Sequence, residues 1–508
     1  MNKPRSSTLI LFWFGAVIFL SSACLLVLEI VASRLLAPYI GASLYTWTAI
    51  IGVILAGLSI GNWIGGFWAD HGGGARAAGA TLIAAALATL VIPYLLIPTA
   101  DALQAEPISL MSASLVYVVV LFLVPALFLG IVTPLLTTLA LGYSEKPGKI
   151  VGTMHALAAL GSICGTFATG FWLIPLLGTR LIILITGGAL ALMGLSFLLR
   201  RKGDLALAVA LPIGLTTAVI GLNGLRSPCD AESHYYCIRV LQDDGAFGEA
   251  RTMVLDHMVH SINHRNDPQL LITSYVHAMD ELLRINFRRN DIATPTIFFA
   301  GGGAYTQPRA LIQRHPEAKL VVAEIDPMVT RIAADHLYVD MGNIDVRDQD
   351  ARLVLPILGE SSQDAIVTDV FHDVAVPWHL TTREFVAMVR SRLTPDGIYL
   401  MNVVDQFPDS KLVKAMLKTL NTEFSSVQIW LEGVPDQPSR MTYVISASNT
   451  KPFPGRLVAD KGLPRAWFDV STPLVKVGTP MDAIPLLTDD HAPVEKLVSD
   501  LIWTKLGT

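Results

Sequence analysis

Residues 296–326 decide the fold of the polar half of the chain, and they read TIFFAGGGAYTQPRALIQRHPEAKLVVAEID. A short apolar run, 297–300, ends in three glycines, 301–303; a helical segment and a second apolar run then lead to Glu324 and Asp326. Bare glycines let the backbone approach a ligand, and the helix that follows points its N-terminus at it. An acid about 20 residues further on can bind a ribose. The pattern predicts the nucleoside-binding half of a doubly wound sheet.

The composition predicts a membrane protein with a separate soluble domain. The 508 residues include only 16% charged ones, and the mean hydropathy is +0.52. Long apolar runs fill residues 9–224, and nearly all acids and bases follow residue 226. Such uneven charge favours more than one domain. The net charge of −5 argues against a general nucleic-acid binder, so we expect no nucleic-acid partner.

Apolar segments of membrane-spanning length recur through the first half, since a span needs about 20 apolar residues. They cover residues 9–31, 44–69, 77–98, 111–141, 150–175, 179–199 and 204–224. The first is too long, and too closely followed by others, to be a cleaved signal peptide. We therefore expect about seven helices, embedded in the lipid bilayer of the cell (inner) membrane.

Basic residues orient this bundle. They precede the first segment and follow the second, fourth and sixth: Lys3, Arg5, Arg76, Lys146, Lys149, Arg200, Arg201 and Lys202. The N-terminus is therefore expected in the cytoplasm, and seven helices would place the soluble domain outside. That placement conflicts with the supply of a nucleoside cofactor, which is made inside the cell. Cys229 and Cys237, eight residues apart, could form a disulfide only on an oxidising side, and free thiols are the equal alternative.

The second half alternates strands and helices, which predicts a mostly parallel, Rossmann-like sheet. Ligands bind at the carboxyl ends of such strands, where the glycines, Glu324, Asp350 and Asp369 all fall. We expect a transmembrane domain at residues 1–226, a small β element with a linking helix at 227–290, and the nucleoside-binding transferase domain at 291–508.

Several motifs resemble those of the spermidine synthase family, the polyamine aminopropyltransferases, and in particular its membrane-fused bacterial members. They run from about residue 233 to 495 and include AGGGAYTQPRAL, VVAEIDP, DQDARLVL, AIVTDVF, VPWHLTTREF, LTPDGIYLMNV and LTDDHAPVE. The resemblance implies an enzyme of polyamine biosynthesis that moves an aminopropyl group from decarboxylated S-adenosylmethionine, or uses S-adenosylmethionine itself, with a small-molecule amine as acceptor. It implies no metal, and a homodimer is a possible assembly.

The resemblance also implies roles for individual residues. The cofactor site would consist of Gly301, Gly302, Gly303, Glu324, Asp326, Asp350 and Ala351. Glu324 would hold the ribose and Asp350 the adenine amino group. Asp369 would be the catalytic acid, with His372 as a second candidate whose pKa is nearer neutrality. Asp256, Tyr275 and Asp373 would bind the amine.

Three departures from the family pattern keep other functions open. Ala304 stands where the family has an aspartate that holds the cofactor's amine. The residues from His257 to His260 replace a glycine–glutamine pattern of the family. Tyr275 is followed by Val276 and His277, where the family has histidine and glutamate. One alternative is a methyltransferase, because an intact methionine carboxylate prefers no acid beside it. Another is a non-catalytic transport or sensor protein, favoured only by the intramembrane Glu29 and the glycine-rich helices.

Overall fold

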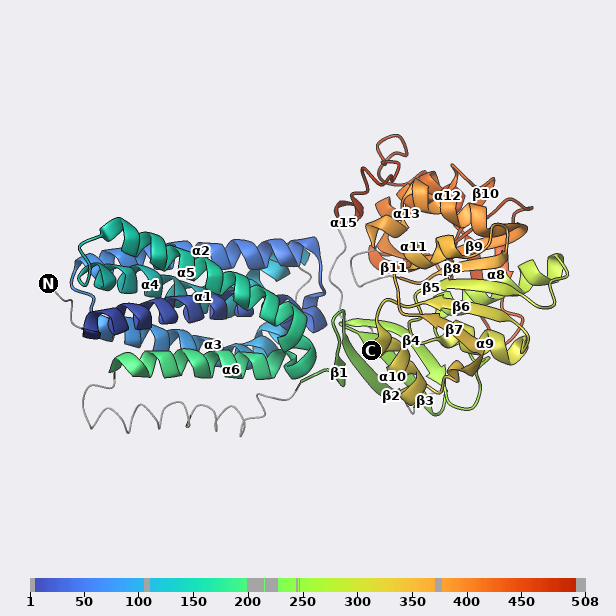
Figure 1. The fold of residues 1–508 in the computed structure, drawn as a ribbon. Coiled ribbons are helices and arrows are strands. Elements are labelled where there is room, and N and C mark those ends of the chain that lie inside the picture. Colours follow the sequence, from blue (N-terminus) through green and yellow to red (C-terminus); the bar gives the residue numbers. More distant parts are fainter. Residues whose placement is uncertain are drawn as a thin grey trace. The chain divides into compact units, whose positions relative to one another are not determined.

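The computed structural model describes residues 5–104, 110–198, 214, 227–243, 245, 247–370 and 377–498. Two compact units divide the chain, Met1–Pro228 and Cys229–Thr508. The first unit is helical and the second is α/β (Figure 1). The predicted fold class, a helical membrane-type bundle fused to a Rossmann-like domain with a small β element, is confirmed.

Long apolar helices build the first unit. They are α1 (Arg5–Ile40), α2 (Leu44–Asp70), α3 (Ala75–Gln104), α4 (Leu110–Leu141), α5 (Pro147–Ala168) and α6 (Ile174–Leu198), with a π-helical turn, Thr169–Leu173, between the last two. Six of the seven predicted apolar segments fall on these helices. The seventh, 204–224, lies outside the described residues, as do Lys3, Arg200, Arg201 and Lys202.

Five helical stretches in the described part are long and apolar enough to cross a membrane. The last of them, Pro147–Leu198, is 52 residues long and contains two of the predicted segments. A straight helix of that length would measure about 80 Å, far more than the roughly 30 Å of a bilayer core. Gly178 breaks it with φ 70° and ψ 164°, and α5 and α6 are separate helices of the bundle (Figure 1). The helices are compatible with a multi-pass membrane protein.

Small residues let the helices of the bundle pack closely. A Cβ added at Gly61 of α2 would lie 2.1 Å from the carbonyl oxygen of Leu127 in α4, and one at Gly161 of α5 would lie 2.0 Å from that of Phe19 in α1. Close backbone contact of this kind is how helices associate in a bilayer. Gly66, in contrast, has open space around it. Gly61 therefore allows the close packing of α2 against α4.

The α/β unit begins with a four-stranded antiparallel sheet in the order β1-β2-β3-β4. Its strands are β1 (Ala231–Glu232), β2 (Cys237–Asp243), β3 (Ala250–Leu255) and β4 (Met258–His264). The alternating residues at 235–242 and 251–257 predict β2 and β3, whereas β1 and β4 are not predicted. The turn into β4 at Asp256, with φ 53°, reverses the chain without a glycine. A Cys229–Cys237 disulfide joins the segment before β1 to β2.

A nine-stranded sheet forms the centre of the unit, in the order β12-β13-β10-β11-β9-β8-β5-β6-β7. Its strands are β5 (Thr296–Ala300), β6 (Lys319–Ala323), β7 (Ile344–Arg347), β8 (Gln363–Thr368), β9 (Leu393–Phe407), β10 (Ser426–Leu431), β11 (Ser439–Ser448), β12 (Arg456–Val458) and β13 (Ala466–Asp469). Strands β5 to β9 pair in parallel, and β10 to β13 join as antiparallel strands.

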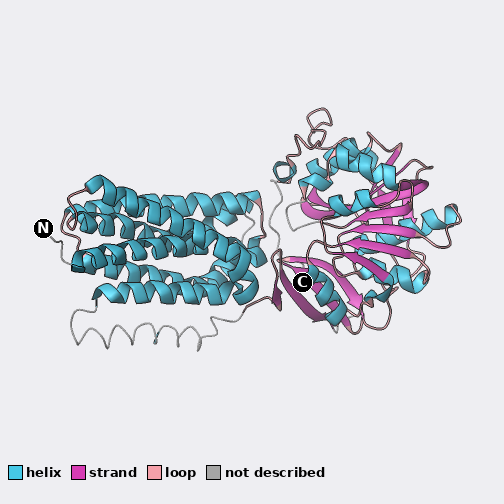
Figure 2. Ribbon diagram, viewed as in Figure 1, coloured by secondary structure: helices cyan, strands magenta, loops and turns pink. Residues whose placement is uncertain are grey.

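Helices cover both faces of this sheet (Figure 2). The α-helices of the unit are α8 (Ser274–Arg289), α9 (Thr306–Arg314), α10 (Pro327–His336), α11 (Ala351–Val354), α12 (Arg383–Arg392), α13 (Lys411–Leu420), α14 (Ser471–Leu474) and α15 (Val494–Leu497). Met279 of α8 and Leu311 of α9 pack with Phe299 of β5 in one buried cluster. Because the central strands are buried on both faces, they read as continuous apolar runs.

One turn that the sequence predicts is not formed. The proline and glycine at 395 and 397 predict a turn at 394–397 before a strand at 398–403, but β9 runs unbroken from Leu393 to Phe407. The extra residues form an irregularity in the pairing with β8, where the register shifts between Gln363 and Ala365. The proline and glycine at 395 and 397 that signal a turn are also found at bulges.

Candidate functional site

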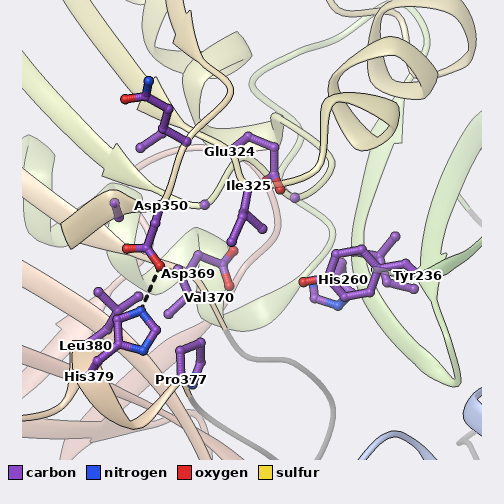
Figure 3. Close-up of a pocket in the computed structure, with 16 residues that line it drawn as sticks. Tyr236, His260, Glu324, Ile325, Asp350, Asp369, Val370, Pro377, His379 and Leu380 are labelled. Atoms are coloured by element: carbon purple, nitrogen blue, oxygen red, sulfur yellow. Dashed lines mark hydrogen bonds and ion pairs between the residues drawn. The ribbon is translucent and has the colours of Figure 1, made fainter. Parts of the chain in front are cut away.

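A pocket lies at the carboxyl ends of the central strands, where the topology of the sheet predicts a ligand. The predicted site residues on its lining are Gly301, Gly303, Glu324, Asp350, Ala351 and Asp369. Figure 3 shows the three acids on one side and, on the other, Tyr236 from the β1–β2 connection and His260 from β4 of the small sheet. The two sheets of the unit therefore build the pocket together.

The glycine turn needs its glycines for two separate reasons. Gly301 and Gly303 have φ of 87° and 51°, in the left-handed region that side chains disfavour. A Cβ on Gly301 would also lie 2.2 Å from the carbonyl oxygen of Asp369. The bare turn thus lets the ends of β5 and β8 meet, which brings Asp369 to the same pocket as the glycines.

Glu324 is buried behind the glycine turn. Its Oε2 accepts the N–H of Gly302 at 2.8 Å, and its Oε1 accepts that of Asp326 at 2.9 Å. Burial raises the pKa of Glu324 to about 7, although these backbone hydrogen bonds oppose the change. A carboxylate held in this way keeps lone pairs for further donors, as the predicted ribose contact requires.

Asp350 begins helix α11, with Ala351 as its first residue. Its Oδ1 accepts the N–H of Arg352 at 2.7 Å, and its Oδ2 lies 2.8 Å from Nε2 of His379 (Figure 3). The hydrogen bond from His379 is the main reason that the pKa of Asp350 is lowered. Asp350 is therefore an ionised acceptor at the pocket wall, as binding of an exocyclic amino group requires.

Arg352 and Asp489 hold His379 in place. Arg352 donates to the carbonyl oxygen of His379 at 2.7 Å, and its guanidinium forms two hydrogen bonds with Asp489, at 2.8 and 2.5 Å. Bidentate pairs of this type fix orientation as well as charge. This contact gives the LTDDHAPVE motif, far along the sequence, a structural role at the pocket.

Asp369 directly follows β8 and carries a hydrogen bond on each oxygen. Tyr275 lies 3.1 Å from its Oδ2, and Nδ2 of Asn402 donates to its Oδ1 at 2.8 Å. Burial raises the pKa of Asp369 to about 6, against both hydrogen bonds. The Tyr275 hydroxyl is also 2.6 Å from the carbonyl oxygen of His260, and its single proton can serve one acceptor at a time. The arrangement suits an acid that binds and accepts protons near neutral pH.

Sequence reasoning missed Asn402, which is 4% exposed. It lies on β9, next to Met401, which pairs with Thr368 of β8. A signal was available: Asn402 is the one amide inside the apolar stretch 398–404 of a buried strand. Tyr236 and His260 were not predicted to line the pocket either. Their position there depends on how the small sheet packs against the large sheet, which residue type and spacing do not show.

Among the described residues, four predicted site residues are not on the pocket lining: Gly302 and Tyr275, which contact Glu324 and Asp369, and Asp326 and Asp256. Asp326 caps α10 through the N–H of Met328 at 3.0 Å, and Ser233 donates to its other oxygen. Asp256 is buried at the β3–β4 turn, where its Oδ1 accepts the N–H of Cys237 at 2.9 Å. His372 and Asp373 lie outside the described residues.

Over the part of the chain that the structure describes, three or more His, Cys, Asp or Glu side chains are nowhere grouped so that they could hold a metal ion. The polar groups of the pocket are instead hydrogen-bonded carboxylates, an amide, a phenol and imidazoles.

The fold defines a Rossmann-like domain with a pocket at the carboxyl ends of its parallel strands. A probable polyamine aminopropyl transferase of Bifidobacterium longum is 26% identical over 214 residues, 39% of this chain and 47% of its own. A polyamine aminopropyltransferase of Vibrio vulnificus is 34% identical over 119 residues, 23% and 39% of the two chains. These matches support the relationship to the spermidine synthase family that the motifs predict.

The similarity is partial. The chain spans less than half the length of either of these curated relatives, and no family model matches it. Among solved structures, that of a probable spermidine synthase from Corynebacterium glutamicum has a TM-score of 0.46 and 21% identity; the match covers 53% of this chain and 99% of the other.

Proposed function

We propose that the α/β unit is a transferase that moves an aminopropyl-type alkyl group from an adenosyl sulfonium donor to an amine and releases methylthioadenosine. The observation that carries the proposal is the hydrogen-bonded group of Tyr275, Asp369 and Asn402 beside the glycine turn. The names of the two curated relatives add support.

The donor occupies the pocket with its adenosyl end toward β6 and β7. Asp350 accepts the adenine amino group, and Glu324 accepts the ribose hydroxyls. The sulfonium then lies over the glycine turn, close to Asp369, because the order of the strands places β8 on the other side of β5. Asp326 acts indirectly, since its backbone N–H holds Glu324.

The acceptor amine is bound by Asp369. A free alkylamine has a pKa of about 10 and arrives protonated, so the site must orient it and take a proton. Asp369 binds the ammonium, Tyr275 and Asn402 hold the carboxylate, and the neutral amine attacks the carbon beside the sulfonium. Asp256, His372 and Asp373 remain predictions for the acceptor side.

Product analysis tests the proposal. Purified full-length protein is incubated with putrescine and either decarboxylated S-adenosylmethionine or S-adenosylmethionine, and nucleoside products are identified by mass spectrometry. Methylthioadenosine from either donor supports alkyl transfer. S-adenosylhomocysteine as the product would mean methyl transfer. Binding of either donor without formation of either product would favour the alternative that the protein is a non-catalytic sensor.

We further propose that the apolar helices anchor the enzyme in the cell (inner) membrane, with the N-terminus in the cytoplasm and the α/β unit outside. This location requires that the adenosyl donor be exported from the cell. The basic residues beside α2 and α4 favour this orientation, and the Cys229–Cys237 disulfide favours an oxidising compartment. Maleimide labelling of intact cells, with and without prior reduction, tests it: labelling by a membrane-impermeant reagent only after reduction supports the outside location. Labelling that requires permeabilised cells contradicts it.

A further inference from the structure

A disulfide closes the loop that leads into the small sheet. Cys229 and Cys237, eight residues apart, are its two ends, and we call residues 229–237 the disulfide loop. Inside it, β1 pairs with β2 through two residues, and a pairing this short is marginal by itself. Cys237 is fixed in the sheet, because its N–H donates to Oδ1 of Asp256 at 2.9 Å and its carbonyl oxygen accepts the N–H of Asp256 at 2.8 Å. The disulfide therefore ties the start of the loop to a fixed point.

Tyr236, the residue before Cys237, brings the disulfide loop into the pocket. Its side chain is part of the pocket lining, opposite the three acids (Figure 3). Burial and three nearby carboxylates, chiefly that of Glu324, raise the pKa of its hydroxyl. The hydroxyl is therefore neutral at pH 7 and lies in the field of the acid proposed to bind the ribose. A phenol can exchange hydrogen bonds with ribose hydroxyls, and its ring can pack against the adenosyl group.

Ser233 connects the same loop to the other side of the pocket. Its hydroxyl accepts the N–H of Tyr236 at 2.9 Å, and its N–H donates to the carbonyl oxygen of Tyr236 at 2.9 Å. The hydroxyl also donates to the carboxylate of Asp326. The backbone N–H of Asp326 in turn donates to Oε1 of Glu324 at 2.9 Å. A displacement of the disulfide loop would therefore disturb both Tyr236 and Glu324.

We propose, resting on the proposed function, that the disulfide loop is part of the donor site and that its disulfide holds Tyr236 and Ser233 in the arrangement that binds the adenosyl group. A dithiol that reduces it supplies two electrons and two protons, which gives two thiols and the cyclic disulfide of the reductant. The start of the loop then loses its tie to Cys237, and donor affinity falls. Because binding and oxidation are linked, the bound donor also makes the disulfide harder to reduce.

Calorimetric titration with methylthioadenosine tests the proposal without acceptor or turnover. Full-length protein is titrated as purified, after reduction by dithiothreitol, and after reoxidation. We expect reduction to weaken binding about tenfold, the size of one lost hydrogen bond, and reoxidation to restore it. The double variant Cys229→Ser, Cys237→Ser is expected to bind like the reduced protein with and without dithiothreitol, which controls for effects of the reductant elsewhere in the chain.

The reverse measurement distinguishes a disulfide linked to the site from one that only stabilises the fold. The wild type is equilibrated in dithiothreitol redox buffers, with and without saturating methylthioadenosine, and its thiols are counted by alkylation and mass spectrometry. A tenfold difference in affinity requires the same factor in the redox equilibrium, which is about 30 mV for a two-electron couple. We expect the midpoint to become more negative by this amount. A disulfide without a link to the pocket would keep its midpoint.

Two variants test the side chain that contacts the donor. Tyr236→Ala is expected to weaken methylthioadenosine binding about tenfold in the oxidised protein and to reduce the effect of dithiothreitol to less than about threefold. Tyr235→Ala changes the neighbouring tyrosine, which is 40% exposed and off the pocket lining, and is expected to keep the full effect. A full effect in Tyr236→Ala would overturn the assignment of Tyr236 to the donor site.

The results separate this inference from the proposed function. Weaker binding after reduction, together with the shift in midpoint, supports the inference and the nucleoside site on which it rests. Equal affinities of the oxidised and reduced proteins, with an unchanged midpoint, overturn the inference and leave the proposed function standing. No binding of methylthioadenosine by the oxidised protein overturns both.

Discussion

The hydroxyl of Tyr275 lies 3.1 Å from Oδ2 of Asp369, although 94 residues separate them in the sequence. The contact joins the start of α8 to the end of β8, and Asn402 of β9 holds the other carboxylate oxygen at 2.8 Å. A buried acid with a donor on each oxygen is oriented but still has lone pairs for a substrate. Tyr275 and Asp369 were both predicted as site residues, and the structure brings them together.

Removing the Tyr275 hydroxyl should change the pH dependence of the reaction. The hydrogen bond from Tyr275 lowers the pKa of Asp369, which burial has raised to about 6. Without it the pKa rises further, so the acidic limb of the kcat profile of Tyr275→Phe should move to higher pH, with a loss of about tenfold at pH 7. Tyr235→Phe, at a 40% exposed tyrosine off the pocket lining, is the matched control. An unchanged limb in Tyr275→Phe would show that the hydroxyl does not act on Asp369.

Replacing Asn402 by Asp tests the hydrogen bond to Oδ1 of Asp369. The new carboxylate would face Oδ1 of Asp369 across a distance that is now 2.8 Å, and a like charge raises a carboxyl pKa. We expect activity at pH 7 to fall by at least about tenfold and to recover in part with Asn402→Gln, which keeps the amide donor. Asn421→Asp, at the end of α13, controls for the added charge. Full activity of Asn402→Asp would show that the reaction does not depend on the hydrogen bond between Asn402 and Asp369.

Binding of methylthioadenosine should depend on the ionisation of Glu324. Ribose hydroxyls donate to a carboxylate, so binding favours the ionised form and releases a proton. Because the pKa of Glu324 is about 7, affinity should rise as pH increases through 7. Glu324→Gln should weaken binding roughly 10- to 100-fold and remove this dependence. Calorimetry between pH 6 and 8 measures both, and a variant with the wild-type pH dependence would contradict the ribose assignment.

The close contact between α2 and α4 should make the bundle sensitive to a single methyl group. At Gly61 an added Cβ would lie 2.1 Å from a backbone carbonyl oxygen of α4, whereas at Gly66, five residues on, it meets nothing within 4 Å. Gly61→Ala should therefore lower the unfolding temperature in detergent by several degrees, since overpacking costs about 1–3 kcal/mol. Gly66→Ala should leave it unchanged. Equal effects of the two would mean that α2 and α4 do not pack through Gly61.

Much of the site was predictable because the sequence indicates where the buried strands end. The apolar runs before Gly301, Glu324 and Asp369 mark buried parallel strands, and the topology of such sheets gathers their carboxyl ends at one edge. The bundle was predictable for a similar reason, since a span must be a long apolar helix. Both signals are local in the sequence.

What could not be predicted depends on contacts between distant segments. His379 reaches Asp350 through the pairing of Arg352 with Asp489, which is 137 residues further along the chain. Asn402 acquires its role from the register of β9 against β8. Asp326 was assigned to the cofactor on its position after β6, whereas its carboxylate caps α10. A side chain's partner is set by tertiary packing, which residue type and spacing alone leave open.

The central claim is that Asp369 supports alkyl transfer from an adenosyl sulfonium to an amine. The most direct measurement is methylthioadenosine release by purified wild-type protein and by Asp369→Asn, with both donors and putrescine, beside the affinity of each protein for methylthioadenosine. The account predicts release by the wild type, a loss of at least about 100-fold in the variant, and affinities within about tenfold of each other, because the Asn keeps the shape of the site. Full release by Asp369→Asn, or S-adenosylhomocysteine as the wild-type product, would contradict it.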